Sequence, residues 1–287
     1  MNIEDLQAFL SVADHASFSR AAEALHLTQP AVSKRIAALE SQLDTRLFDR
    51  IGRQVSLTEA GRALREHARR IVTEIEDSRR AIHNLSGTVS GPLKLATSHH
   101  ISLHRLPPVL HAYTRQYLQV QLDLGFMDSE EACRAVEQGE LELALVTLPP
   151  ADTSSLTQIK IWTDRLVLAA SPEHPLSQTK KIDAATLARH PAILPARGTY
   201  TRALIDQALA VGQLETRLET HYLETIKMLV SVGLGWSLLP DTMLDASLRP
   251  RQGANIQVQR QLGIAHHPQR VLSNAARAFI ELCRSES

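Results

Sequence analysis

The uninterrupted helical stretch from Thr58 to Leu85 is the feature that most limits what this chain can fold into. It contains no proline, its only glycine is Gly61, and one set of its positions recurs at alternating steps of four and three, the spacing of a two-helix coiled coil. The positions are Leu64, Ala68, Ile71, Ile75, Ser78, Ile82 and Leu85. Because a long helix must cover its apolar stripe, we expect a homodimer in which all of these positions except Ser78 meet a second copy; packing on the chain's own domain is the alternative.

Three short helices and a hairpin are expected before this stretch. The apolar spacing of residues 3–13 predicts a first helix, Ser17 or Ser19 can cap a second, and Thr28 can cap a third. Alternation of side chains after the third helix predicts a two-stranded wing. So few residues cannot form a large core, and they suit a compact recognition module.

A different pattern follows the cluster of helix-breaking residues at 86–92. Strands alternate with helices in two successive series, which predicts two α/β lobes with a mostly parallel sheet. The expected domains are a winged helix-turn-helix at 1–58, a linker helix at 59–88, and a two-lobed α/β domain at 89–287, with lobe I at 91–163 and 268–287 and lobe II at 164–267.

Composition excludes several classes of protein. Hydrophobic residues make up 44 % and charged residues 22 % of the chain, which excludes collagen, wholesale disorder and a disulfide scaffold. Lys plus Arg (31) equals Asp plus Glu (31), so bulk charge does not indicate nucleic acid. The two cysteines, Cys133 and Cys283, are expected to be reduced packing residues. Neither a signal peptide nor a run of about 20 apolar residues is present in the sequence, so we expect a cytoplasmic protein that does not enter a membrane.

The third helix carries the strongest indication of DNA binding. Val32, Ile36, Leu39 and Leu43 share one face, which leaves a small, basic face pointing outward. Small residues allow a helix to enter a groove about 12 Å wide, and amide, hydroxyl and cationic side chains can contact phosphates or base edges. The candidate DNA-binding residues are Thr28, Gln29, Pro30, Ser33, Lys34 and Arg35 on the helix and Arg50 and Arg53 at the wing.

The same residues carry a family resemblance. The block from Phe18 to Ile36, followed by Leu39–Glu40, Leu47–Arg50 and Leu57–Gly61, resembles the winged helix-turn-helix of the LysR-type transcriptional regulators. The resemblance implies a regulator that binds double-stranded promoter DNA, responds to a small-molecule effector, and assembles as a homotetramer built from two dimers. It also admits RNA polymerase as a partner.

A candidate effector site lies in the second half of the chain. Ligands of doubly wound sheets bind where loops leave the carboxyl ends of strands, which selects polar residues after several predicted strands. The resemblance adds Glu224 and Thr225 and supports most of the others. The candidates are Ser98, His99, His100, Ser129, Thr147, Arg197, Thr199, Tyr200, Glu224 and Thr225. They suit an anion such as a carboxylate or sulfate, although Glu224 leaves an effector with an amino or hydroxyl group open.

Other functions are less well supported by the sequence. His99, His100 and His104 could contribute to a zinc site, but no nearby Cys or acidic residue completes the ligand set, so neither a metal nor a cofactor is expected. No nucleophile elbow surrounds Ser98, and we do not expect an enzyme. The alternative function is a cytoplasmic solute-binding or sensing protein whose helical module binds a protein partner.

Overall fold

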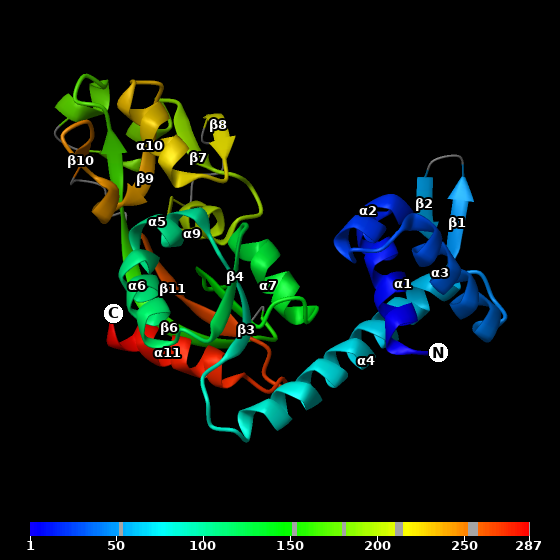
Figure 1. Cartoon of the computed structure of the whole chain (residues 1–287). Coiled ribbons are helices and arrows are strands. Elements are labelled where there is room, and N and C mark those ends of the chain that lie inside the picture. Colours follow the sequence, from blue (N-terminus) through cyan, green and yellow to red (C-terminus); the bar gives the residue numbers. More distant parts are fainter. Residues whose placement is uncertain (52–53, 151–153, 180–181, 210–214, 252–257, 287) are drawn as a thin grey trace. The chain divides into compact units, whose positions relative to one another are not determined.

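The computed structural model describes residues 1–51, 54–150, 154–179, 182–209, 215–251 and 258–286 (Figure 1). The chain divides into two compact units, Met1–Ser86 and Gly87–Ser287. Among the described helices, none combines the length and the hydrophobicity that crossing a membrane requires.

The first unit contains four helices and a hairpin. The elements are α1 (Ile3–His15), α2 (Phe18–Ala24), α3 (Gln29–Leu43), β1 (Phe48–Ile51), β2 (Gln54–Leu57) and α4 (Glu59–Asn84). Three of the helices begin where the sequence offers a capping hydroxyl: Ser17, Thr28 and Thr58 each accept a hydrogen bond from a backbone N–H three residues later. Of the two candidate caps for α2, the structure therefore uses Ser17.

The helices of the first unit pack around one apolar core. Val32, Ile36 and Leu39 of α3 are buried against α1 and α2, as their spacing predicts, and Phe48 of β1 packs beside Phe9 with ring centroids 5.3 Å apart. The expectation that Leu43 joins this face is wrong. Leu43 is exposed because α3 ends there, at a left-handed Asp44 that turns the chain away.

The predicted stripe on α4 is divided. Ala68 is fully buried and Leu64 half-buried in the core of the same unit, so the amino-terminal part of the stripe follows the alternative, packing on the chain's own domain. Gly61 lies at this contact, where a Cβ atom would collide with the carbonyl oxygen of Leu47. Further along the helix, Ile82 and Leu85 are exposed, Leu85 at 85 %. Only the later part of the stripe is free to meet another chain.

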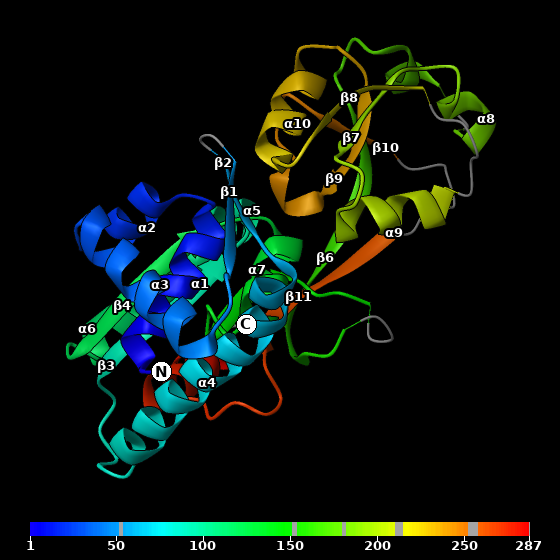
Figure 2. The ribbon, with the colours of Figure 1, turned by 90° about the vertical axis from the view of Figure 1, so that its right-hand side faces the viewer.

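The second unit is built on one mixed sheet. Its strands are β3 (Gly91–Thr97), β4 (Val120–Phe126), β5 (Leu143–Thr147), β6 (Thr157–Ala170), β7 (Ala192–Pro195), β8 (Thr216–Thr220), β9 (Trp236–Pro240), β10 (Arg249–Arg251) and β11 (Val258–His266). They lie in the order β4-β3-β5-β11-β6-β9-β7-β8, with β10 paired to β6. The expected parallel pairing occurs inside each lobe, but β11 is antiparallel to both β5 and β6. The reason is that β6 leaves the first lobe and β11 returns to it, so the two strands run in opposite directions (Figure 2).

Helices cover both lobes. They are α5 (His99–His104), α6 (Leu106–Gln116), α7 (Ser129–Glu137), α8 (Ala184–Leu187), α9 (Tyr200–Leu209), α10 (Leu223–Ser231) and α11 (Asn274–Ser285), with 3-10 turns at Pro175–Gln178 and Asp241–Met243. In the first lobe, buried residues of α6 and α11 pack on the sheet in one cluster and those of α7 in another. The second lobe has a cluster that includes α9 and another that includes α10.

The two long strands also bear on the expected lobe limits. β6 runs without a break through the expected boundary between residues 163 and 164. On the return, Leu262 to Ala265 of β11 already pair with β5 of the first lobe, before the expected boundary at 267. The passages between the lobes are therefore two paired strands rather than loops, with one irregularity in their pairing between Leu262 and Gly263.

Candidate functional sites

The outward face of α3 has the exposure that groove binding requires. Thr28, Gln29, Pro30 and Lys34 are exposed, and Ser33 is half-buried. Thr28 Oγ1 accepts from the N–H of Ala31 at the start of the helix, and Gln29 Nε2 donates to Ser33 Oγ across 3.0 Å. These side chains lie opposite the buried face of the same helix.

Two of the predicted DNA contacts differ from this group, and one lies outside the described residues. Arg35 is turned toward α1, where its Nη1 donates to the carbonyl oxygen of Glu4 at 3.4 Å. Arg50 lies on β1 opposite Val55, but its side chain is not among those described. Arg53 is outside the described residues. The structural support for DNA binding therefore comes from α3 rather than from the wing.

A cavity of about 530 Å³ lies in the second unit and is lined by both lobes. It contains eight of the ten predicted effector residues: Ser98, His99, His100, Ser129, Thr147, Thr199, Glu224 and Thr225. Six of these residues were selected because they lie where a predicted strand ends or a helix begins, and Glu224 and Thr225 were selected by the family resemblance. Thr147 and Ser129 contact directly, since the Thr147 N–H donates to Ser129 Oγ across 3.1 Å.

Arg197 and Tyr200 do not line the cavity. The Arg197 side chain is 78 % exposed, and its Nε donates to Glu219 at 3.3 Å, an arrangement typical of a solvated surface ion pair. The backbone N–H of Tyr200 donates to a carboxylate oxygen of Glu130, while its ring packs beside Cys133. Burial, with the nearby Cys133 and Glu130, raises the pKa of the Tyr200 hydroxyl well above its usual range.

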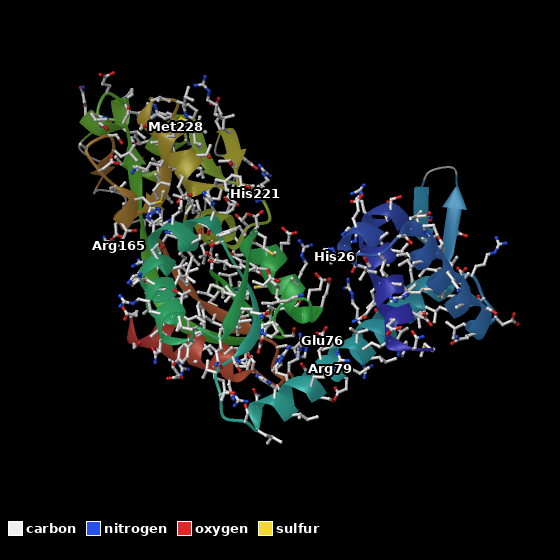
Figure 3. The ribbon with its side chains drawn as sticks, viewed as in Figure 1. His26, Glu76, Arg79, Arg165, His221 and Met228 are labelled. Atoms are coloured by element: carbon white, nitrogen blue, oxygen red, sulfur yellow. The ribbon has the colours of Figure 1, made fainter. Side chains whose placement is uncertain are left out.

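Several lining residues were not predicted. They are Phe126, Met127, Asp128, Glu130, Glu131, Pro195, Thr201, His221, Tyr222, Leu223 and Arg260. The first five extend from the carboxyl end of β4 into α7, so the loop rule could have selected them. His221, labelled in Figure 3, precedes α10 and pairs with Asp128 of the other lobe at 2.6 Å. Arg260 lies within β11, a strand whose sequence gave no signal of its own.

Asp164 is the buried centre of the charge network beneath the cavity. It lies on β6 and is fully buried; Arg260 Nη2 and Arg105 Nη2 each donate to it at 2.7 Å, and His100 Nε2 lies 3.2 Å from its Oδ2. Burial alone would raise the pKa of Asp164, but hydrogen bonds from His100, Arg105 and Arg260 together with the Arg260 charge hold it well below its usual range. Asp164 is therefore a carboxylate at neutral pH and neutralises the buried Arg260.

Glu224, in the second lobe, contacts two histidines of the first lobe. Its Oε1 lies 3.1 Å from His104 Nε2 and 3.4 Å from His100 Nδ1. Burial would raise the pKa of Glu224, but the close approach of His100 and His104 outweighs this effect and lowers the pKa to about 2. Glu224 is thus ionised, and the cavity has an acidic side chain at the contact between the lobes.

Two family matches account for nearly the whole chain. Residues 3–62 match the family described as bacterial regulatory helix-turn-helix protein, lysR family, and residues 86–287 match the LysR substrate binding domain. The chain belongs to the LysR family of transcriptional regulators. It is a DNA-binding transcriptional regulator with an effector-binding domain, and the winged helix-turn-helix and two-lobed α/β fold expected from the sequence are confirmed.

LysR-family relatives extend over the full length. The chain is 33 % identical to the HTH-type transcriptional regulator CfxR of Cupriavidus necator, over 99 % of this chain and 90 % of that protein. It is 30 % identical to a probable RuBisCO transcriptional regulator of Synechocystis, over 97 % of this chain and 84 % of that protein. A regulator from the ibpB-leuC intergenic region of Azotobacter vinelandii is 68 % identical over 108 residues, which are 38 % of this chain and 75 % of that protein.

Solved structures of LysR-family regulators share the fold. A full-length variant of OxyR from Pseudomonas aeruginosa has a TM-score of 0.73 and 22 % identity, over 100 % of this chain and 94 % of that one. CbnR complexed with its target DNA has a TM-score of 0.63 and 22 % identity, with 100 % of both chains covered. The likeness extends through both units of the chain.

Proposed function

We propose that this LysR-family regulator reads duplex DNA with the outward face of α3 and responds to a small polar effector bound between the lobes of its second unit. The observation that carries the DNA contact is the division of α3 into two faces. Val32 and Ile36 are fully buried, while Pro30 and Lys34 are exposed on the other side. A narrow helix with small residues and a cation on its free face fits the major groove.

Binding to the promoter DNA that flanks the gene tests this role. Lys34→Ala removes a phosphate contact, so affinity should fall on all sequences and the slope of log affinity against log salt should become shallower by about 1. Changing Gln29 to Ala should instead relax the preference at one base position. Lys94→Ala is the matched control, because Lys94 is an exposed lysine on β3 in the second unit. Equal affinity and salt slope for Lys34→Ala and wild type would contradict the assignment.

The residues lining the cavity favour an effector of mixed character over a simple anion. Among the described lining residues, four carboxylates (Asp128, Glu130, Glu131 and Glu224) face one guanidinium, that of Arg260, a formal balance of −3 with neutral histidines. The guanidinium is already neutralised by Asp164. Hydroxyl groups such as those of Ser98 and Thr147 can bind an anionic group, and Glu224 can accept from an amino or hydroxyl group.

A thermal-shift screen of the full chain tests the cavity. A ligand that binds only the folded state raises the apparent stability, and amino acids should do so more than simple carboxylates or sulfur oxyanions. Glu224→Gln should remove the advantage of the amino acids. Arg197→Ala, outside the cavity, is the control and should leave it unchanged. A screen in which Glu224→Gln alters no ligand's effect would contradict the placement of the effector.

The oligomer we propose is a homodimer through the later part of α4, paired further into a tetramer. Exposed Ile71, Ile82 and Leu85 support this, together with Ile75, whereas Ala68 is already covered within its own unit. The working domain limits stay 1–58, 59–88 and 89–287. We further propose that the chain acts in the cytoplasm, where promoter DNA and RNA polymerase are present, and that it regulates transcription without an enzymatic activity of its own.

A further inference from the structure

We propose that His100, His104 and Glu224 form a binding site for a divalent transition-metal ion, most simply Zn²⁺, that links the two lobes of the second unit. The site combines two histidines of α5 with a carboxylate from the first turn of α10. This inference goes beyond the proposed function. It does not depend on DNA binding, and it shares Glu224 with the proposed effector contact, whereas His104 is not among the residues that line the cavity.

The distances among the candidate ligand atoms fit a small ion. Histidines four residues apart on a helix point to the same side, and the rings of His100 and His104 lie with centroids 4.7 Å apart. In a tetrahedral zinc site with bonds of about 2.0–2.1 Å, neighbouring ligand atoms are roughly 3.3 Å apart. Glu224 Oε1 lies 3.1 Å from His104 Nε2 and 3.4 Å from His100 Nδ1, and one ligand atom from each of the three residues lies within 4.8 Å of the others.

An unpartnered nitrogen points into the site. His100 is only 4 % exposed, and its Nδ1 makes no hydrogen bond to any described residue. Its other nitrogen, Nε2, faces the Asp164 carboxylate at 3.2 Å. With Nε2 protonated and donating to Asp164, the Nδ1 lone pair faces the Glu224 carboxylate, which is repulsive unless a cation lies between them. Glu224 Oε2 is likewise buried without a hydrogen-bond partner among the described residues.

His100 has the kind of supporting hydrogen-bond partner that metal-binding histidines usually have. Such a histidine commonly donates its second N–H to a carboxylate, which fixes the tautomer and makes the ligating nitrogen more basic. Asp164 plays this part for His100, and it is itself held in place by Arg105 and Arg260. The His104 side chain is 36 % exposed, which provides a route from solvent.

The charge of the cavity favours a cation as well. A divalent ion would offset most of the formal balance of −3 among the described lining residues, and a three-ligand site leaves a fourth position open. No acidic residue lies near His99, His100 and His104 in the sequence, so the sequence did not predict a metal site. Glu224, 120 residues beyond His104 in the chain, supplies the acidic ligand only after folding.

The test measures metal binding to the full chain after chelator treatment, without DNA or effector. Calorimetric titration with Zn²⁺ should show one ion per chain, and Co²⁺ should give the visible absorption bands of a tetrahedral site. His104→Ala and Glu224→Gln should each weaken Zn²⁺ binding by more than about 100-fold, beyond the loss typical for an outer-shell partner. Both side chains are partly exposed, so each variant should fold, and circular dichroism is the measurement that checks this.

Two control variants separate this site from adventitious binding. His99→Ala removes a neighbouring histidine that lines the cavity, and His111→Ala removes an exposed histidine on α6. Both should bind Zn²⁺ as tightly as wild type. The proposal is overturned if wild type binds no stoichiometric ion, in which case a proton serves between His100 and Glu224, or if His104→Ala and Glu224→Gln bind Zn²⁺ like the controls. Neither result bears on the DNA-binding test, so the two proposals can fail separately.

Discussion

Replacing Asp164 with asparagine should destabilise the second unit strongly, because the change removes a buried charge and little volume. The carboxylate is fully buried, and Arg260, itself 4 % exposed, donates to it through both Nε and Nη2. A neutral amide at this position would leave the buried Arg260 cation without the carboxylate that accepts its hydrogen bonds. Removing one partner of a buried ion pair costs about 3–5 kcal/mol. For a domain of this size about 2–4 °C are lost per kcal/mol, so the unfolding temperature should fall by roughly 6–20 °C.

Tryptophan fluorescence measures this loss in the intact protein. Both tryptophans of the chain, Trp162 and Trp236, lie in the second unit, so their signal follows its unfolding alone. Asp123→Asn is the matched control, because Asp123 is exposed on β4 and an exposed substitution of this kind changes stability by about 0.5 kcal/mol or less.

The pH dependence gives a second readout for Asp164→Asn. The folded-state pKa of Asp164 is lowered, so its contribution to stability is fully present above the unfolded-state pKa of about 3.9 and is lost as the pH falls through the folded-state pKa. The deficit of the variant should therefore be constant from neutral pH down to about pH 5 and shrink below about pH 4. A loss at pH 7 no larger than that of Asp123→Asn, or a deficit that grows on acidification, would refute the reasoning.

Three further predictions concern the helix α4, the cysteines and the contact of α4 with the core. Ile75→Asp should yield monomers in light scattering at micromolar concentration, whereas Arg70→Asp, at an exposed position off the stripe, should stay dimeric; a dimeric Ile75→Asp protein would exclude the later part of α4 as the interface. Burial raises the pKa of the Cys133 and Cys283 thiols to about 12, so neither should react with a thiol reagent before the protein unfolds, and rapid labelling of native protein would contradict this. Gly61→Ala should lower the free energy of unfolding of the first unit by about 1–3 kcal/mol, measured by urea unfolding followed by circular dichroism. An unchanged urea midpoint would show that the backbone at Leu47 can move to accept the added methyl group at little cost.

Much of the first unit follows from the sequence because its determinants are local. Helical spacing placed Val32, Ile36 and Leu39 on the buried face of α3, and capping hydroxyls marked the helix starts. Exposure of Lys34 on the opposite face needs no knowledge of distant residues. The same reasoning failed at Leu43, where a helix end, rather than the periodicity, decides exposure. It was also incomplete at Ala68, because an apolar residue on a helix does not indicate which surface covers it.

The residues predicted for the effector cavity likewise fall into those that the sequence placed correctly and those that it did not. Residues such as Ser98 and Thr147 could be selected from the sequence, because a side chain at the carboxyl end of a parallel strand lies at one edge of the sheet whatever the rest of the chain does. Arg197 satisfied the same rule, but its side chain is exposed and pairs with Glu219 instead. The rule places the backbone of a residue at one edge of the sheet and does not fix the direction of a long, flexible side chain.

By itself, the sequence determined the order of the domains, the two faces of α3 and the strand ends that supply the cavity, all of which depend on neighbours within a few turns or one strand. Only the tertiary structure decided that β6 and β11 run through both lobes, that Arg260 and Asp164 neutralise each other beneath the cavity, and that Glu224 meets His100 and His104. The last two sets of contacts join residues 96 to 124 positions apart in the chain. Their formation depends on how the whole sheet brings the two lobes together, which no local pattern of side chains encodes.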